Sequence, residues 1–553
     1  MEIRSFATTA VDKLGRRLPL SAQPPGGRKP RLTALFYFLW NGEHGDAEQL
    51  IPKNVSAILR EEPRAGYMPD APLWGGPSAF YYWGEPLYGY YLSRDPWVMS
   101  RHVELFVEAG IDVLIFDATN AFIYTEVVLR LLEVLDEGRR MGWPVPRIAY
   151  YTNSSPGDTA ERIYRDIYAP GKYPELWFRV GGKPLLITRE EACSREVREF
   201  FQIRQSQWPN EPAQENGFPW ISFVRPQQIY ADRQGGNRVL SVSPAQHPGI
   251  LMGDSAMYGA TDNWGRSYHN GQADPRPGAS AYGYNFEEQW ERAFRTDPDM
   301  VFLTGWNEWT MNRLQGPPER PVRFVDNANE EYSRDIEPMA GGHGDNYYLQ
   351  MTANIRRYKG YNPPVYPIKA ADESRFGDPA FWEGLDPAIR PFLHHTEERN
   401  YPGFHGEYFR GCSVRNRFAL LKVAAGGGRT AFYAQACKGL SPDKEGAWMR
   451  LYIGGLEDSG ASEDSFGGFH LYVEDGFLYR FAEDGWEKAG VADVWRFEKA
   501  LAVAVPEELL PSPVLVFKWA DSRIPYDTPD DFYSKGFCAP VGRFGYAAWR
   551  EVP

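Results

Sequence analysis

Residues 95–120, DPWVMSRHVELFVEAGIDVLIFDATN, contain a complete helix signal that runs directly into a complete strand signal. Asp95 is a favoured N-cap, Pro96 is a favoured first helical residue, and Gly110 is a typical helix stop. Apolar residues recur at helical spacing between these signals, and an unbroken apolar run follows from residue 111. The stretch therefore predicts a helix followed at once by a buried strand, the repeating pair of parallel α/β folds.

The same alternation of apolar runs and helical segments extends from residue 31 to about residue 304. Seven strand-like runs are visible: LTALFYFLW (32–40), IDVLIFDATN (111–120), RIAYYTN (147–153), PLLIT (184–188), WISFV (220–224), RVLSVSP (238–244) and MVFLTGWNEW (300–309). An eighth strand is expected within GILMGDSAMY (249–258). We therefore predict an α/β fold, a (β/α)8 TIM barrel over residues 31–360, after an N-terminal extension at residues 1–30. DNYYLQMTANIRRYKG (345–360) is expected to be the closing helix of the barrel, ending at Gly360.

The pattern changes after the barrel. Residues 361–379 are rich in proline and charge and have no periodicity, which predicts a linker. Short alternating strands follow, such as FHLYV (469–473) and FLYRF (477–481), which flank Asp475 and Gly476 in a two-residue hairpin turn. Residues 380–553 are accordingly predicted to form an all-β sandwich, an accessory domain to the barrel.

The composition narrows the class of ligand. Of the 553 residues, 43% are hydrophobic and 24% charged, which is typical of a soluble globular protein, whereas 15% aromatic residues is unusually rich. Part of that excess fits the lining of a carbohydrate cleft. The net charge of -13 argues against nucleic acid and anionic membrane as partners, since both select an excess of Lys and Arg. A neutral substrate is expected, and the oligomeric state stays open.

The first 20 residues lack the apolar core of a signal peptide, and no run approaches the length of a membrane span, so a cytoplasmic location is expected. The four cysteines show neither a C-x-x-C pair nor zinc-site spacing, which favours free thiols. Cys412 and Cys437 would be the pair to form a disulfide if the protein were secreted.

The last strand-like run ends in Trp306, Asn307, Glu308 and Trp309. Sugar chemistry uses these groups: a carboxylate to move protons, an amide to bind hydroxyls, and flat rings for the apolar face of a pyranose. Because active sites of such barrels lie at the carboxyl ends of the strands, Glu308 is the first candidate for catalysis. The alternative is that both tryptophans are core residues and that Glu308 caps a nearby helix or pairs with an arginine.

Two earlier strand ends supply the other catalytic candidates, Asp117 and Glu43. Asp117 follows the buried run of the second strand, where its alternative role is to cap the next helix. Further strand-end and loop residues are expected to bind sugar hydroxyls or rings, although each could be an ordinary loop or surface residue: Asn41, His44, Asn120, Tyr151, Asp262, Trp264 and His269.

We predict no catalytic metal and no cofactor. His394 and His395 are adjacent, so their side chains diverge in regular structure, and a solvated loop is the preferred interpretation. A structural calcium ion in the acidic loop that carries Asp527, Asp530 and Asp531 stays open as an alternative.

The WNEW box, together with LFYFLWNGEHG near the start of the barrel and the stretch at 95–120, resembles the glycoside hydrolase family 71/99-like barrels, a group that contains endo-α-mannosidases. The resemblance covers roughly residues 31–360. It implies a (β/α)8 barrel, a glycan substrate, hydrolysis of a glycosidic bond and an accessory β domain. The family pattern carries a second Glu three positions after the first, whereas this chain has Met311. Either another residue supplies the acid, for which the candidates are Asp117, Glu43, Asp254 and Asp262, or the mechanism differs.

Two other functions stay open at this point. Met311 is compatible with a glycan-binding protein on a barrel that has lost catalysis. Arg225, Arg266 and Arg313 near strand ends are compatible with a lyase or epimerase acting on a sugar acid, whose carboxylate they would hold.

Overall fold

The fold was examined in a computed structural model. It describes residues 6–549 apart from residues 25, 27–28, 45–50, 77–78, 250, 260–261, 326, 394–397, 412–413, 457–464 and 484. The chain divides into two compact units, one formed by Gln23–Gly360 with Tyr401–Phe409 and the other by Met1–Ala22, Tyr361–Asn400 and Arg410–Pro553.

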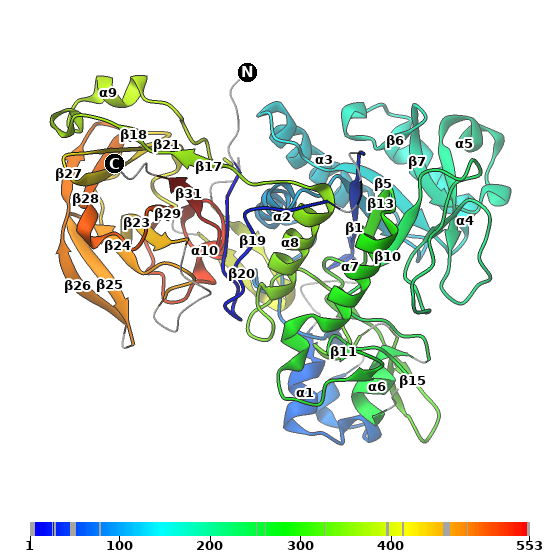
Figure 1. The fold of residues 1–553 in the computed structure, drawn as a ribbon. Coiled ribbons are helices and arrows are strands. Elements are labelled where there is room, and N and C mark those ends of the chain that lie inside the picture. Colours follow the sequence, from blue (N-terminus) through cyan, green and yellow to red (C-terminus); the bar gives the residue numbers. More distant parts are fainter. Residues whose placement is uncertain are drawn as a thin grey trace. The chain divides into compact units, whose positions relative to one another are not determined.

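Eight parallel strands form a nearly closed barrel in the first unit (Figure 1). The last strand, β13, pairs with the first, β1, as a barrel requires, and β9 and β10 stand at the two ends of the hydrogen-bonded order. The predicted barrel is confirmed. In spatial order its strands are β10 (Val239–Val242), β13 (Met300–Leu303), β1 (Leu32–Tyr37), β4 (Val113–Ala118), β5 (Arg147–Thr152), β7 (Lys183–Thr188), β8 (Gln202–Gln207) and β9 (Gly217–Pro219), and the short β6 (Arg179–Val180) pairs with β7.

The segment 249–258, in which the sequence predicts a strand, instead contributes the helix α6 (Met252–Tyr258). The missing strand is β8, QIRQSQ, whose polar composition hides it from a hydrophobicity pattern. Its Arg204 is buried and donates to the carbonyl oxygens of Asn216 at 3.1 Å and Asn237 at 3.0 Å. Backbone acceptors thus allow a charged side chain inside the unit, which no local sequence pattern reveals. The predicted run WISFV lies directly after β9.

The helices of the barrel follow their sequence signals. In α2 (Pro96–Ala109) the Asp95 carboxylate accepts a hydrogen bond from Trp97 N at 3.0 Å, and Gly110 ends the helix in the left-handed conformation, as predicted. The closing helix also ends at Gly360 as expected. The remaining helices of the unit are α1 (Val55–Glu61), α3 (Thr125–Arg140), α4 (Pro156–Ile163), α5 (Arg195–Phe200), α7 (Tyr284–Thr296) and α8 (Asn346–Lys359).

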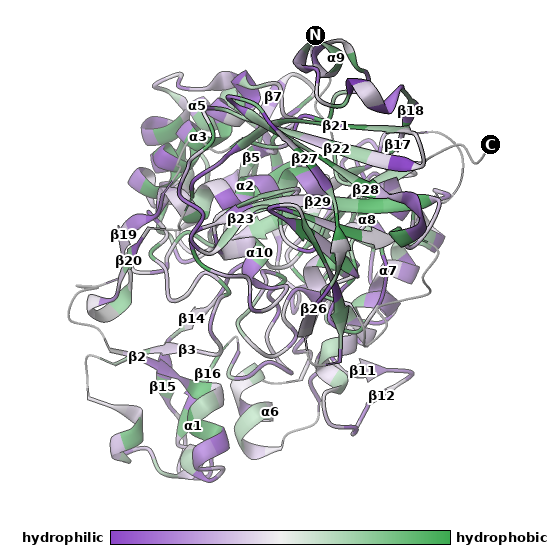
Figure 2. Ribbon diagram, turned by 90° about the vertical axis from the view of Figure 1, so that its left-hand side faces the viewer, coloured by the Kyte–Doolittle hydropathy of each residue, from purple (hydrophilic) through white to green (hydrophobic). Residues whose placement is uncertain are grey.

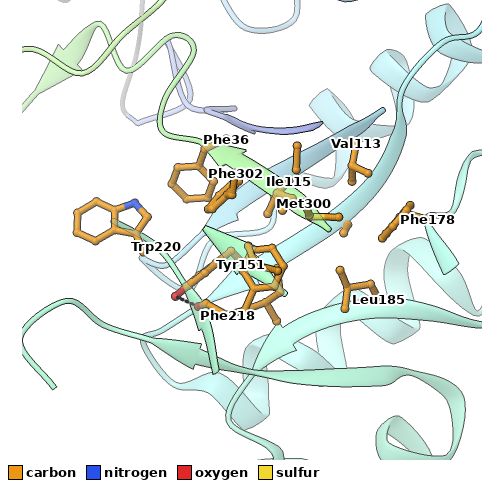
Figure 3. Packing of buried hydrophobic residues seen from close by; sticks show 14 of the residues in the cluster. Phe36, Val113, Ile115, Tyr151, Phe178, Leu185, Phe218, Trp220, Met300 and Phe302 are labelled. Carbon is orange, nitrogen blue, oxygen red and sulfur yellow. Dashed lines mark hydrogen bonds between the residues drawn. The ribbon is translucent and has the colours of Figure 1, made fainter. Parts of the chain in front are cut away.

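Alternate residues of the strands fill the barrel interior (Figure 3). Phe36 packs edge-on against Tyr151 and Phe302, with ring centroids 6.0 Å and 5.6 Å apart. On β4 the buried residues of this cluster are Val113 and Ile115. Because side chains alternate along a strand, the next residue on the same face is Asp117, at the carboxyl end.

Small sheets are added to this unit. Thr310 and Met311 form β14, which pairs with β3 in a three-stranded sheet. The added strands are β2 (Ile51–Asn54), β3 (Ala79–Tyr82), β14 (Thr310–Met311), the hairpin of β11 (Tyr268–His269) and β12 (Gln272–Ala273), and the pair β15 (Arg313–Gln315) and β16 (Val322–Phe324). The pair β19 (Asn400–Pro402) and β20 (Tyr408–Arg410) spans the change from one unit to the other.

The second unit contains two mostly antiparallel sheets, so the predicted C-terminal β fold is confirmed. Phe432 of one sheet packs against Phe517 of the other at 5.4 Å, as in a sandwich. The first sheet contains β17 (Val365–Pro367), β31 (Tyr546–Trp549), β29 (Val514–Ser522), β23 (Ala447–Gly455), β24 (Leu471–Glu474), β25 (Phe477–Ala482), β26 (Gly485–Val491) and β30 (Phe537–Ala539). The second contains β18 (Lys369–Ala370), β21 (Phe418–Gly426), β22 (Arg429–Ala436), β28 (Ala500–Pro506) and β27 (Asp493–Arg496).

Local signals in this unit are also accurate. Asp475 and Gly476, with φ of 50° and 85°, form the turn between β24 and β25, as predicted. The strand β28 appears green along most of its length in Figure 2, because its ALAVAV sequence is hydrophobic, and these six residues are buried. Two short helices complete the unit, α9 (Pro379–Gly384) and α10 (Asp531–Ser534).

The segments at the predicted boundaries take part in this unit. β17 and β18 lie within the expected linker, residues 361–379, and each pairs with a strand of a sheet. Thr9, from the expected N-terminal extension, forms a bridge with Gly545. The domain boundaries themselves stay a prediction. Within the described residues, no helix has the length and apolar character needed to cross a bilayer.

The Asp95 cap gives a test of the α2 boundary. Asp95→Ala should lower the free energy of unfolding by about 1 kcal/mol, because the N-terminal N–H groups of α2 lose their acceptor. Asp95→Asn, which keeps an acceptor oxygen, should lose less. Urea denaturation followed by circular dichroism measures both changes, and equal losses for the two variants would contradict a capping role.

Candidate active site at the barrel mouth

Glu308 is fixed by three hydrogen bonds just beyond the end of β13. Its backbone N donates to Asp335 Oδ1 at 2.6 Å, its carbonyl oxygen accepts from Asn327 Nδ2 at 3.1 Å, and its carboxylate accepts from Arg334 Nη2 at 2.7 Å. The Arg334 and Glu308 side chains are only 1% and 7% exposed. A carboxylate buried this deeply needs a compensating charge, and the Arg334 guanidinium supplies it.

Arg334 connects Glu308 to a group of aromatic rings. Its guanidinium carbon lies 4.8 Å from the centroid of Trp220, which stacks on Trp208 at 4.4 Å with an interplanar angle of 13°. Arg334 Nη1 lies 3.4 Å from Nδ1 of His247. Burial, and secondly the Arg334 charge, hold the pKa of His247 well below its ordinary value, so this imidazole is neutral near neutral pH.

Asp335 holds the backbone of Glu308 in place. Its Oδ1 accepts from the Glu308 backbone and its Oδ2 accepts from Trp83 Nε1 at 3.2 Å. Burial raises the pKa of Asp335 from 3.8 to about 6, although the hydrogen bond from Glu308 and the charges of Arg266 and Arg334 oppose this shift. Asp335 therefore titrates in a range where its protonation affects the placement of Glu308.

Asp117 lies at the carboxyl end of β4 and is also buried. Its Oδ1 accepts from Thr119 N at 2.8 Å, a local turn bond of the kind expected of an Asp at a strand end. The Asp117 charge, with that of Glu43, helps to raise the pKa of Tyr124, after burial as the main cause. Both predicted carboxylates are thus near the Tyr124 hydroxyl.

A second polar group forms around this hydroxyl. Nε2 of His44 lies 2.8 Å from Tyr124 Oη, and Asn120 Nδ2 donates to the same oxygen at 2.8 Å. Burial lowers the pKa of His44, while Glu43 opposes the shift. The structure therefore brings together four residues predicted from separate strand ends: Glu43, His44, Asp117 and Asn120.

Glu43 has a strong partner of its own. Arg94 Nε donates to Glu43 Oε1 at 2.9 Å and Nη2 donates to Oε2 at 2.7 Å, a bidentate ion pair. With both carboxylate oxygens occupied, Glu43 is better placed to orient its neighbours than to transfer a proton.

The neighbours of Glu308 in the WNEW box are core residues. Trp306 is fully buried and packs against Phe106, with ring centroids 4.8 Å apart. Trp309 is also fully buried; it stacks on Trp83 at 4.5 Å and donates to Glu337. Neither indole exposes a face for a sugar, so of the two interpretations of the tryptophans the structure favours packing.

Asn307 fixes the position of the box relative to β1. Its Oδ1 accepts from Phe38 N at 2.9 Å and its Nδ2 donates to Phe38 O at 3.1 Å. Two further predicted hydroxyl-binding residues are likewise internal. Tyr151 donates to Phe218 O at 3.0 Å, and Asn41 exchanges hydrogen bonds with Ser93 at 3.0 Å and 2.8 Å.

The remaining candidates lie in other environments. Asp262 is exposed, and Asp254, which lies within α6, is buried in an ion pair with Arg323 at 2.7 Å. Trp264 and His269 line a surface cleft beside α7. Sequence reasoning missed Arg334, Asp335, Trp208, Trp220 and Tyr124; recognition of β8 as a strand would have pointed to Trp208, but nothing local marks the other four.

The described residues contain no group of three or more His, Cys, Asp or Glu side chains arranged for a metal. In the acidic loop that left calcium open, Asp530 pairs with Arg543 and Lys13, and Lys535 pairs with Asp527 and Asp531. These carboxylates are thus already paired with lysine and arginine side chains. His394, His395 and Cys412 lie outside the described residues.

No family model and no curated protein matches this chain. Two solved structures of the GH99 endo-alpha-mannosidase from Bacteroides thetaiotaomicron match it, one of them in complex with BIS-TRIS-Propane. The matches cover 59% of this chain and 97% and 98% of those chains, at 13% and 14% identity and TM-scores of 0.34 and 0.35. The chain has a structural match to a GH99 endo-alpha-mannosidase. At this identity the likeness concerns the fold alone, so the chemistry has to come from this chain's own side chains.

The Asp335 carboxyl gives a prediction of pH-dependent stability. Since its pKa is about 6 in the folded chain and near 3.8 without burial, the folded chain holds a proton that the unfolded chain releases. Its contribution to stability is fully present below about pH 4 and is lost as the pH rises through about 6, by about 3 kcal/mol in total.

Asp335→Asn removes this titration. The difference in free energy of unfolding between the natural chain and the variant should therefore shift in favour of the variant from pH 4 to pH 6.5, measured by urea denaturation. A difference that does not change over this pH range would show that the pKa of Asp335 is not raised.

Proposed function

We propose that this protein is a glycoside hydrolase whose active site is the barrel mouth, with Glu308 and Asp117 as its carboxylate pair. The observation that carries the proposal is the placement of two buried carboxylates at the carboxyl ends of β13 and β4. Only β1 separates these strands, so their backbones are about 10 Å apart. Side chains that extend toward the barrel axis from such positions can flank one glycosidic bond.

The two carboxyl groups have different surroundings, as the two roles in glycoside hydrolysis require. Glu308 faces Arg334 and is suited to act as a carboxylate at the anomeric carbon, either as nucleophile or as base for the attacking water. Asp117 lies near the Tyr124 hydroxyl and is suited to donate a proton to the leaving oxygen. Cleavage then consumes one water and gives the free sugar and the protonated leaving group.

Half-buried rings and neutral side chains at the mouth suit a neutral glycan. Trp40 and Trp208 are partly exposed, and His44 lies edge-on to Trp40 with ring centroids 5.6 Å apart. Glu43, Asn120 and the imidazoles of His44 and His247 supply donors and acceptors for hydroxyl groups. We assign the sugar-binding role to these residues, in place of the buried Trp306 and Trp309.

The carboxylate pair is tested on a panel of plant and microbial oligosaccharides, with the products separated by chromatography. Glu308→Gln and Asp117→Asn should each lower kcat/KM by about 10²–10⁴-fold, because each removes a group that transfers protons or stabilises charge. Asp254→Asn changes a buried carboxylate of the α6 region and should leave kcat/KM within about threefold.

Full activity in both Glu308→Gln and Asp117→Asn would contradict the assignment. Sugar binding without cleavage of any member of the panel would support the glycan-binding alternative instead. An unsaturated product that absorbs ultraviolet light would identify a lyase.

The aromatic assignment gives a matched pair of substitutions. Trp208→Phe should weaken sugar binding with little change in stability, because this indole is half-exposed at the mouth. Trp306→Phe should instead lower the free energy of unfolding by about 1–3 kcal/mol through a packing defect and leave sugar affinity unchanged. Calorimetry measures the sugar affinity of both variants, and urea denaturation measures their free energy of unfolding. Weaker sugar binding by Trp306→Phe and unchanged binding by Trp208→Phe would instead identify Trp306 as the ring that contacts the sugar.

A further inference from the structure

A cleft of about 710 Å³ is lined by residues of α7 and of the β11–β12 hairpin. Figure 1 labels α7 and β11. This volume falls within the usual range of small-molecule sites. None of the residues that form the Glu308 and Tyr124 groups lines it. Trp264 and His269, which the sequence assigns to sugar binding, do line it. Their separation from the barrel mouth raises the question of a second ligand.

One wall of the cleft is built around Arg225. Its guanidinium carbon lies 4.6 Å from the ring centroid of Trp264 and 4.7 Å from that of Tyr268. Its Nη2 donates to Gln246 Oε1 at 3.2 Å, and its Nη1 pairs with Glu288 of α7. The cation therefore fixes two rings and a carboxylate in one arrangement, so this wall is ordered before any ligand arrives.

The cleft is also lined by part of a column of stacked rings. His269 stacks on Tyr284 at 4.3 Å, and Tyr284 stacks on Tyr282 at 5.4 Å with an interplanar angle of 5°. Tyr282 is 42% exposed and lies outside the lining. Rings stacked in this way leave their outer faces and edges for a ligand, and such a surface can receive the apolar face of a pyranose at little cost in conformational entropy.

The polar lining contains as many cations as anions. Three arginines, Arg225, Arg292 and Arg295, face three glutamates, Glu287, Glu288 and Glu291. Glu291 is paired with Arg357, and Glu287 accepts from Gln350 and Asn354, whereas the side chains of Arg292 and Arg295 make no bond within the described residues. Guanidinium donors and carboxylate acceptors thus lie side by side in a lining with three formal charges of each sign, and this arrangement can bind vicinal hydroxyl groups. Arg292 and Arg295 make an acidic sugar the necessary comparison.

We propose that this cleft is a second binding site for a neutral oligosaccharide, outside the barrel mouth. The rings of the Tyr284 column receive the apolar faces of the sugar units, and the arginines of α7 bind their hydroxyl groups. The choice of a sugar as ligand rests partly on the glycosidase function proposed for the mouth. A second site of this kind holds a long glycan while the mouth cleaves it, and so raises the local concentration of substrate.

Hydrogen exchange with mass spectrometry tests the proposal in the full chain carrying Glu308→Gln, so that the ligand is not cleaved. The probes are short mannan-, xylan- and β-glucan-derived oligosaccharides, with an oligogalacturonate as the acidic comparison. With a neutral probe we expect slower exchange both in segments 264–271 and 282–295 of the cleft and in segments 303–311 and 331–336 of the mouth.

Adding Tyr284→Ala and Arg292→Ala should remove the protection at the cleft and weaken binding there about tenfold or more, while protection at the mouth persists. Tyr67→Ala, the same change at a tyrosine that is 50% exposed elsewhere, should leave both protections intact.

The two proposals fail in different ways. Protection at the mouth but not at the cleft with any neutral probe would overturn the second site alone. Protection of the cleft only by oligogalacturonate, or protection that survives the double substitution, would also overturn it. Protection at the cleft without protection at the mouth would support the second site and count against the proposed active site.

Discussion

The need to compensate buried charge is the constraint on which the barrel mouth depends. Glu308 sits at the end of an apolar strand with its carboxylate almost fully enclosed, and an ion placed there without a partner would cost several kcal/mol. Arg334 provides that partner, and Asp335 holds the backbone of Glu308 in place. The segment that carries Arg334 and Asp335 therefore packs against the end of the barrel, where both residues contact Glu308.

A second buried hydrogen-bond network, centred on Glu337, stabilises the WNEW box. Glu337 accepts from Tyr91 Oη at 2.8 Å and from Trp309 Nε1, and its other oxygen lies 2.7 Å from Nε2 of His102. These bonds connect the WNEW box to α2 and to the loop before it. Since every polar group in such a network needs its partner, the box cannot shift without breaking several bonds at once. This rigidity is consistent with the use of its tryptophans for packing, and the sugar contacts that we propose involve the partly exposed Trp40 and Trp208 instead.

Much of the fold could be read from local patterns. The alternation of runs predicted the barrel, and the cap of α2, the end of α8 and the Asp475–Gly476 turn were each correct, because these signals depend on neighbouring residues only. The pattern failed at β8, since the strand is polar and its buried Arg204 is satisfied by carbonyl groups of residues 216 and 237, outside the strand. For the candidate site, the strand ends pointed to Glu308, Asp117, His44 and Asn120. They did not predict the environment of Glu308, nor that the other three would lie together around Tyr124.

The sequence by itself determined most of the order of strands and helices, the carboxylates at the strand ends and the change to β structure after the barrel, because periodicity and capping are local properties. Only the tertiary structure decided which carboxylate is paired with which cation and which rings are buried. Arg334 and Glu308, which form an ion pair, are 26 residues apart in sequence. Trp264, which the sequence assigned to the barrel mouth, lines the cleft beside α7 instead. Such pairings depend on how the loops fold over the barrel end, where charge compensation and ring packing between distant segments outweigh any local preference.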